Sequence, residues 1–91
     1  MANKTVDTEA LGRANIALKI YIGKVQMGIN MLSNSAQDCS DNMGSDVYSQ
    51  LAIKELNFCL KDMQKAIDKA EDVMQKISKK ITEIEDSSRN F

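Results

Sequence analysis

The chain has 91 residues, with no proline, tryptophan or histidine, and its 12 basic and 13 acidic residues give a net charge of −1. This length allows one domain at most and lies near the lower limit for burying a self-sufficient core, so association with another chain would supply burial that it lacks. The balanced charge predicts no electrostatic attraction to nucleic acid or anionic lipid.

Residues 1–7 are mostly polar and show no periodicity, so we expect a flexible N-terminus. Thr8 or Asp7 can cap the helix that follows, with Glu9 in its first turn. From there, two interleaved sets of residues recur seven apart, which predicts a helix over residues 8–39 with one stripe facing a partner helix. The sets are Leu11, Leu18, Val25, Leu32 and Cys39, and Asn15, Ile22, Ile29 and Ala36.

Residues 40–45 concentrate turn formers, and Gly44 is able to take a positive φ at the helix C-terminus. Ser45 or Asp46 then caps a second helix, expected over residues 46–86. Apolar residues recur along it in a rhythm of four and three, without polar interruption, so this helix also needs a partner along its whole length. They are Ile53, Leu56, Leu60, Met63, Ile67, Ala70, Met74, Ile77, Ile81 and Ile84.

Two long helices joined by so short a link fold back antiparallel, because neither buries its stripe otherwise. The predicted fold class is therefore all-α, an antiparallel two-helix hairpin that completes a four-helix bundle by dimerisation or by partner binding. Pairing the helices outward from the turn sets Met27 beside Phe58 and leaves Ile81 and Ile84 beyond the end of the first helix. We expect residues 87–91 to form a flexible tail.

Two features of the first helix concern packing between helices. Asn15 is the one strongly polar seam position, and a buried Asn can fix the register of two helices at some cost in stability. Gly23 and Gly28 allow another backbone to approach closely.

A second group of apolar residues lies outside the seam and forms the predicted partner-binding surface. On the first helix these residues lie roughly opposite the seam, and on the second they lie near the turn, so we expect them to join as one patch. An exposed apolar patch of this size marks an interface, either the core of a homodimeric four-helix bundle or the docking site of a different protein. The residues are Ile16, Ile20, Met27, Met31, Val47, Leu51 and Phe58.

The chain offers little for chemistry. Without histidine, it lacks the residue whose ordinary pKa suits proton transfer near neutral pH, and no Cys-His or Ser-His pair can form. Cys39 and Cys59 occupy apolar helical positions, where buried free thiols are common, and two thiolates are too few to hold a metal. We therefore predict no catalytic residue, no metal site and no cofactor.

We also find no segment in the sequence of the kind that directs a chain into or across a membrane. No run of about 18 apolar residues is present, and residues 1–11 lack the apolar core of a cleavable signal peptide. We expect synthesis in the cytoplasm, with any export proceeding without a cleavable signal.

The segment Asn42-Met43-Gly44 resembles the Trp-x-Gly turn of the small helical-hairpin proteins of type VII secretion systems, with Asn42 standing where that family has Trp. Val47, Tyr48 and Leu51 follow in place of the small and aromatic residues that open the family's second helix, and residues 60–67 are similar to that helix. The resemblance covers residues 11–86. It implies a divergent branch, such as the small partners of larger LXG-type toxins, which bind the helical N-terminal segment of the toxin and help to target it for export.

Three functions therefore stay open for this chain. The first is an adaptor, or a co-secreted dimer, of a type VII secretion system. The second is a homodimeric coiled-coil assembly protein of a phage or mobile element, and the third is a small immunity protein. An adaptor binds the N-terminal helices of a toxin, an immunity protein binds its active domain, and an assembly protein dimerises without either.

Overall fold

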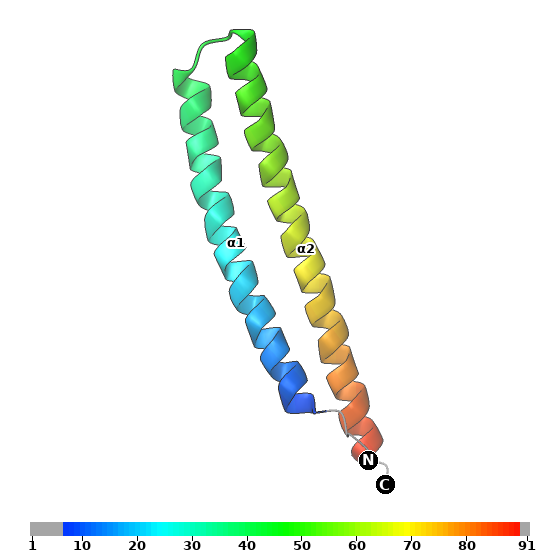
Figure 1. Cartoon of the computed structure of the whole chain (residues 1–91). Coiled ribbons are helices and arrows are strands. Elements are labelled where there is room, and N and C mark those ends of the chain that lie inside the picture. Colours follow the sequence, from blue (N-terminus) through cyan, green and yellow to red (C-terminus); the bar gives the residue numbers. More distant parts are fainter. Residues whose placement is uncertain (1–6, 90–91) are drawn as a thin grey trace, which may run out of the picture.

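The computed structural model describes residues 7–89, with side chains described as far as Ser87, and consists of two helices. Helix α1 spans Thr8–Asn42 and helix α2 spans Val47–Arg89. They run antiparallel, side by side, and a short connection joins them at one end (Figure 1). The predicted all-α hairpin is confirmed, whereas residues 1–6 and 90–91 of the two expected flexible termini lie outside the described residues.

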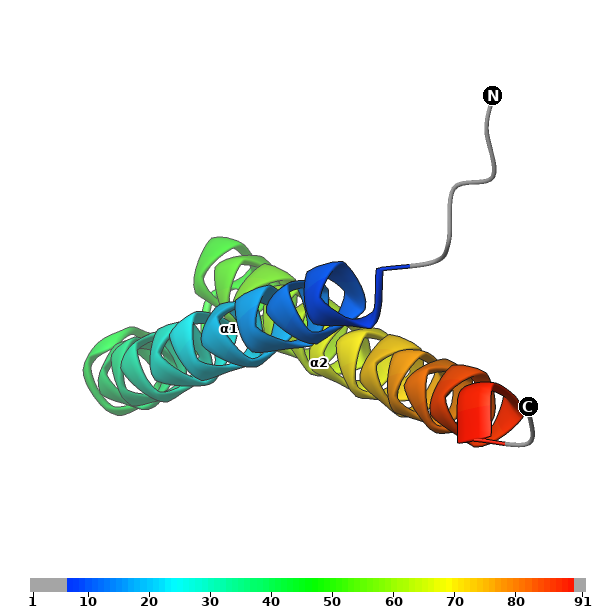
Figure 2. The same ribbon diagram turned by 90° about the horizontal axis from the view of Figure 1, so that it is seen from below.

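The hairpin is a long thin rod. It measures 69 × 23 × 17 Å and has a radius of gyration of 20.6 Å, whereas a compact chain of this length has about 12 Å. Its accessible surface is 7158 Å², against about 5,300 Å² for a compact monomer of the same mass. Figure 2 shows, almost along the rod, that the two helices cross rather than run strictly parallel. The rod shape leaves much more surface in water than a globular fold of equal size.

Helix α1 begins at the cap that Asp7 provides. The Asp7 carboxylate accepts hydrogen bonds from the backbone N–H groups of Glu9, at 2.9 Å, and Ala10, at 3.2 Å. These bonds satisfy two of the donors that the first turn of a helix leaves without an intrahelical partner. Of the two capping residues considered from the sequence, the structure uses Asp7.

Helix α1 ends three residues later than expected, at Asn42. The Asn42 side-chain amide donates to the Asp38 backbone carbonyl at 2.9 Å and to the Asp38 carboxylate at 2.8 Å, so polar residues expected to form a turn stabilise one more helical turn. Met43 then leaves the helix in an extended conformation. Gly44 is able to take a positive φ but does not, since no glycine in the described part of the chain has one.

Helix α2 begins at a cap made by Asp46. Its carboxylate accepts from the Ser49 hydroxyl at 2.6 Å and from the Ser49 backbone N–H at 3.3 Å. These two hydrogen bonds hold the pKa of the Asp46 carboxyl below its usual value, because they favour the charged form. At the other end the helix continues to Arg89, so residues 87–89, which were expected in a flexible tail, are helical.

The seam between the helices contains the predicted residues. All nine seam positions predicted on α1 and all ten on α2 are buried or half-buried. Only three apolar residues within residues 7–87 are fully buried, namely Ala36, Ile67 and Ala70, with 7%, 3% and 6% of their surface exposed. A pair of helices encloses its seam on two sides only, and the other seam side chains therefore keep contact with water.

The register of the two helices differs from the expected one by five or six residues. The Asn15 amide bonds to residues 74 and 78 of α2, and Gly28 lies against the Met63 methyl, so Met27 is level with residues near 63 and not with Phe58. The same register sets Ile81 level with about Leu11, and both are half-buried. The expectation that Ile81 extends beyond the first helix is wrong, because the later end of α1 and the later start of α2 shift the pairing in this direction, whereas Ile84 is level with about Asp7, the cap of α1.

Asn15 joins the two helices at this register. Its amide nitrogen donates to the Met74 backbone carbonyl at 3.3 Å and lies 2.9 Å from the Ser78 hydroxyl. Its amide oxygen is buried and has no hydrogen-bond partner among the described residues. A buried acceptor without a partner costs free energy, so Asn15 fixes the alignment of the helices at the expense of stability.

We predict that Asn15→Leu raises the free energy of unfolding by about 1 kcal/mol, because it removes the buried acceptor and adds apolar seam surface. Asn15→Asp is the matched control and should lower it, because a carboxylate would face the Met74 carbonyl oxygen. Urea denaturation followed by circular dichroism measures both. A lower denaturation midpoint for Asn15→Leu would contradict this account of the seam.

We predict that Asp46→Ala lowers the thermal midpoint at about pH 7, because α2 loses its cap. The pKa of Asp46 is lowered from its ordinary value of 3.8, so its stabilising effect is complete above that value and is lost as the pH falls through the lower pKa of the folded protein. The difference between Asp46→Ala and the wild type should therefore narrow on acidification below about pH 4. Thermal melts over a pH series test this, and a difference that stays constant would contradict the assigned cap.

Candidate protein interaction surface

The residues predicted to bind a partner are exposed on the isolated hairpin. Each of the seven has between 47% and 70% of its surface open to solvent. Those on α1 form what we call the α1 outer stripe, and those on α2 form the α2 outer stripe. The α1 outer stripe is Ile16, Ile20, Met27 and Met31, and the α2 outer stripe is Val47, Leu51 and Phe58.

The two outer stripes lie on opposite sides of the rod. In a helix that turns about 100° per residue, the α1 outer stripe is centred opposite the α1 seam, and the α2 outer stripe is centred opposite the α2 seam. Because the two seams face one another, the stripes face apart. The expected single patch is therefore wrong, and the chain presents two separate apolar surfaces.

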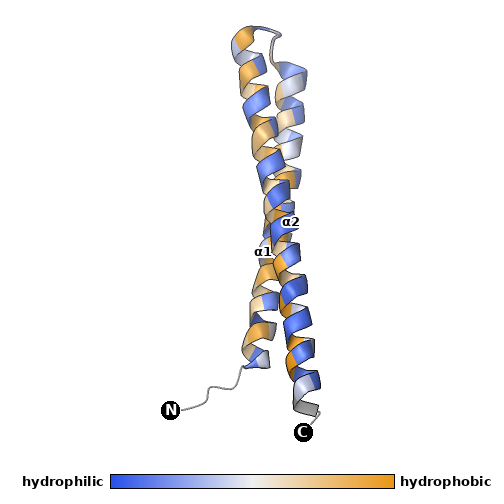
Figure 3. Ribbon diagram, turned by 90° about the vertical axis from the view of Figure 1, so that its right-hand side faces the viewer, coloured by the Kyte–Doolittle hydropathy of each residue, from blue (hydrophilic) through white to orange (hydrophobic). Residues whose placement is uncertain are grey.

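The hydropathy of α2 changes along its length. In Figure 3 hydrophobic turns gather at the end of α2 next to the connection, and hydrophilic residues predominate toward its other end. Beside Phe58, which is 47% exposed, the Lys54 ammonium lies 5.7 Å from the ring centroid in a cation–π geometry. The α2 outer stripe is thus confined to the first three turns of the helix.

Three further exposed apolar or aromatic residues were not among the predicted partner-binding residues. Tyr48 is 83% exposed, Tyr21 is 47% exposed and Met43 is 38% exposed. Tyr48 adjoins Val47, and Met43 begins the connection between the helices. Tyr21 lies seven residues before Gly28, and this spacing places both residues on one side of α1. The same spacing is the sequence signal that would have added Tyr21 to the predicted surface residues.

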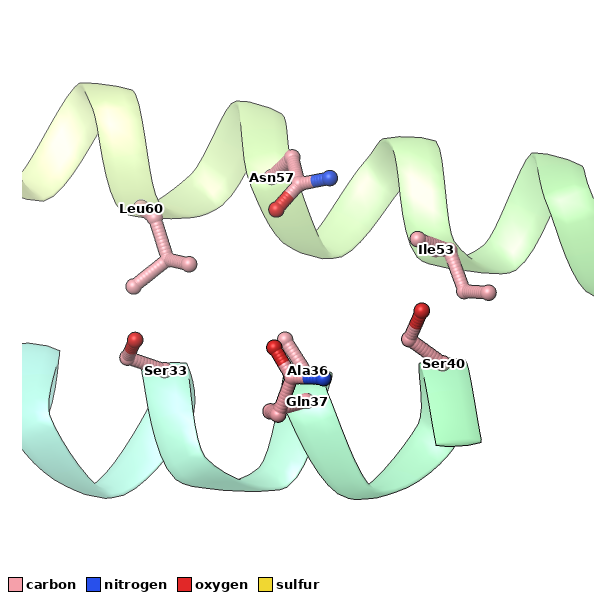
Figure 4. Close-up of a pocket in the computed structure, with 7 residues that line it drawn as sticks. All are labelled: Ser33, Ala36, Gln37, Ser40, Ile53, Asn57 and Leu60. Atoms are coloured by element: carbon pink, nitrogen blue, oxygen red, sulfur yellow. The ribbon is translucent and has the colours of Figure 1, made fainter. Parts of the chain in front are cut away.

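One flank of the hairpin, the polar flank, carries hydrophilic residues from both helices. Near the connection it forms a shallow groove, in which Ser33 and Ser40 direct their hydroxyls toward α2, near Leu60 and Ile53 respectively, with Asn57 between them (Figure 4). Farther along, Lys19 of α1 and Glu71 of α2 line a second depression. The residues around the first groove are Ser33, Ala36, Gln37, Ser40, Ile53, Asn57 and Leu60.

The opposite flank, the apolar flank, is different in composition. On this flank Gly28 lies close to α2, because a Cβ built on it would be 3.0 Å from the Met63 methyl. A Cβ built on Gly23 would meet nothing within 4 Å. Cys59 is exposed here, and not buried as its apolar position led us to expect. Residues at the same heptad position define the flank, which consists of Ala14, Tyr21, Gly28 and Ser35 on α1 and Ala52, Cys59, Ala66 and Val73 on α2.

The remaining face of α2 is charged and solvated. Lys76 and Asp72 form an ion pair at 2.9 Å, and Lys80 and Glu83 form one at 3.4 Å, with all four side chains more than half exposed. Exposed pairs at this spacing support a helix by a few tenths of a kcal/mol each. This face stabilises α2 and gives no sign of a binding site.

No centre for chemistry is evident in the described part of the chain. Residues 7–89 contain no group of three or more His, Cys, Asp or Glu residues that could hold a metal ion. Both cysteines, Cys39 and Cys59, are free thiols. Neither described helix is long and apolar enough to cross a membrane.

We predict that Met27→Asp changes the free energy of unfolding of the isolated chain by less than about 0.5 kcal/mol, because Met27 is exposed. Ile67→Ala is the contrasting variant and should cost about 2–4 kcal/mol, because Ile67 is the most deeply buried side chain. Denaturation of both variants, at a protein concentration low enough to keep the chain monomeric, makes the comparison. A large loss for Met27→Asp would show that Met27 packs within its own chain.

Comparisons of the chain with protein-family models, with curated proteins and with solved structures found no match. The resemblance of Asn42-Met43-Gly44 to the turn of type VII secretion hairpin proteins therefore stays a prediction. The surface described above is the basis on which a function can be inferred.

Proposed function

We propose that the protein is a non-enzymatic adaptor that binds a helical segment of a larger protein along the α1 outer stripe. The proposal depends on the exposure of four apolar side chains of α1 that lie outside the seam, Ile16, Ile20, Met27 and Met31. Their spacing of four, seven and four residues keeps them on one face of α1, over about 22 Å of helix. An amphipathic helix with apolar residues at matching intervals is the partner that such a face fits.

The two methionines favour an adaptable site. Met27 and Met31 are 65% and 69% exposed, and an unbranched thioether side chain can fit different apolar shapes. The α2 outer stripe provides a second contact on the other side of the rod, where Phe58 supplies the largest apolar surface. One hairpin can therefore contact two helical segments at the same time.

The resemblance at the turn supports a more specific role. Under it, the protein acts in a type VII secretion system, either as targeting partner of a larger toxin or as a co-secreted dimer. The adaptor would meet the helical N-terminal segment of the toxin in the cytoplasm and would itself leave the cell, if at all, without a cleavable signal. The support for this role comes from the resemblance of residues 42–44, of the start of α2 and of residues 60–67.

An assembly protein built from a homodimer is the second candidate. It is favoured by the thin core, in which only Ala36, Ile67 and Ala70 are fully buried within residues 7–87. A chain with so little burial gains stability from a permanent neighbour. An immunity protein is a third candidate, and it differs from the adaptor in the part of a toxin that it would bind.

Co-expression of the tagged chain with the helical N-terminal region of a larger protein encoded beside it tests the adaptor. We predict co-purification with the wild type and a loss of at least about tenfold in affinity with Met27→Asp, because a charge enters the apolar contact. Asn34→Asp is the matched control, since it adds the same charge one heptad along the same exposed face. It should leave binding within about twofold.

The same experiment separates the candidates. Binding that survives both Met27→Asp and Phe58→Asp would contradict the outer stripes as the site. Binding only to the toxin's active domain would support an immunity protein instead. A stable homodimer that ignores the added segment would support an assembly protein.

A further inference from the structure

The α1 outer stripe continues into two carboxylates near the connection. Asp38 lies seven residues after Met31, and Asp41 lies three residues farther, so at about 100° per residue both belong to the face of α1 that carries Met27. Both aspartates are exposed. Toward the connection the stripe therefore ends in two negative charges, about 10 Å and 15 Å along the helix from Met31.

Neither aspartate is neutralised by a cation of its own chain. None of the ion pairs in the described part of the chain includes Asp38 or Asp41. Their hydrogen bonds come from neutral amides, from Asn42 to Asp38 at 2.8 Å and from Gln37 to Asp41 at 2.9 Å. Residues 25–53 contain no Lys or Arg. The negative charge at this end of the stripe is thus open to a cation from another molecule.

The position of these two charges is unfavourable for the isolated hairpin. The C-terminal end of a helix carries a partial negative charge and favours basic residues, yet the last turn of α1 contains none. At the other end of the stripe the charges are balanced, because Arg13 is paired with Asp7 at 3.7 Å. A basic partner would therefore be attracted to the connection end of the stripe in particular.

We propose that the partner of the α1 outer stripe is a cationic amphipathic helix, with apolar side chains on Met27 and Met31 and with Lys or Arg side chains on Asp38 and Asp41. This inference rests on the proposed function, because it names the chemistry of the helix that the same surface binds. Two helices packed side by side rise equally per residue, so the basic residues of the partner lie about seven and ten residues from its apolar residue over Met31.

A second copy of this chain fits the surface less well than a foreign helix. A parallel copy would set Asp38 and Asp41 against the same two residues of its neighbour. An antiparallel copy that matched the apolar residues, with Ile16 on Met31, would set Asp38 against Glu9. Both arrangements bring like charges together, whereas a basic segment complements the stripe and its acidic end at the same time.

Titration of the full chain with two synthetic helices tests the proposal. Both probes are amphipathic peptides of about 26 residues, long enough to reach from Ile16 to Asp41, with the same apolar residues. One carries two Lys residues at one end, and the other carries two Glu residues at the same positions. We predict that the Lys peptide binds about fivefold more tightly in fluorescence anisotropy, and that this preference shrinks as the salt concentration is raised.

Neutral variants assign the preference to the two aspartates. Asp38→Asn with Asp41→Asn should abolish it, because asparagine keeps the oxygen that accepts the hydrogen bond within the helix but carries no charge. Asp62→Asn with Asp68→Asn is the matched control, since it removes the same charge from the exposed face of α2 and should leave the preference unchanged. Asp38→Lys with Asp41→Lys should reverse the preference in favour of the Glu peptide.

Several results would overturn the inference. They are a preference for the Lys peptide that survives Asp38→Asn with Asp41→Asn, and an absence of binding by the Lys peptide at about 100 μM. Self-association of the chain that Met27→Asp abolishes, with no preference between the peptides, would replace the foreign helix by a second copy.

The same titrations separate this inference from the adaptor. Equal binding of both peptides that Met27→Asp abolishes would overturn the cationic partner and leave the adaptor standing. Binding of the Lys peptide that Met27→Asp leaves unchanged would contradict the adaptor and, with it, this inference. The two failures are therefore distinguishable.

Discussion

The packing of α1 against α2 along a single seam is the constraint on which the rest of the structure depends. A globular core surrounds its residues, but two helices can shield a seam on two sides only. This is why Ile67 is 3% exposed while most seam residues stay half-open to water. The chain folds as a hairpin because the seam residues of each helix pack against those of the other. The resulting rod nevertheless exposes more surface than a compact protein of the same mass.

The two flanks of the seam and the two outer faces of the hairpin differ in chemical character. The polar flank carries serine, asparagine and charged residues, the apolar flank carries alanine, glycine, tyrosine and valine, and the outer faces carry the two stripes. Each direction presents a different surface to solvent.

The connection sets which residues of the two helices meet. Hydrogen bonds from Asn42 to Asp38 lengthen α1, and the Asp46 cap fixes where α2 begins. The later end of α1 and the later start of α2 account for about four residues of the shift in pairing, and Asn15 holds the resulting alignment from the far end of the seam. The local polar chemistry of a few residues thus decides contacts more than 30 Å away, because a stiff helix carries a shift at one end along its whole length.

The sequence by itself determined the two helices, the residues of both seams and the apolar residues that the hairpin leaves exposed, because a seven-residue period fixes the side of a helix on which each residue lies. It did not determine the register, since residues 40–42, which extend α1, were read as turn formers and the hydrogen bonds of Asn42 to Asp38 depend on a backbone that is already helical. It also did not determine that Val47, Leu51 and Phe58 face away from Met27. Periodicity orients residues within one helix, and only the packing of the two helices relates the faces of one to the faces of the other.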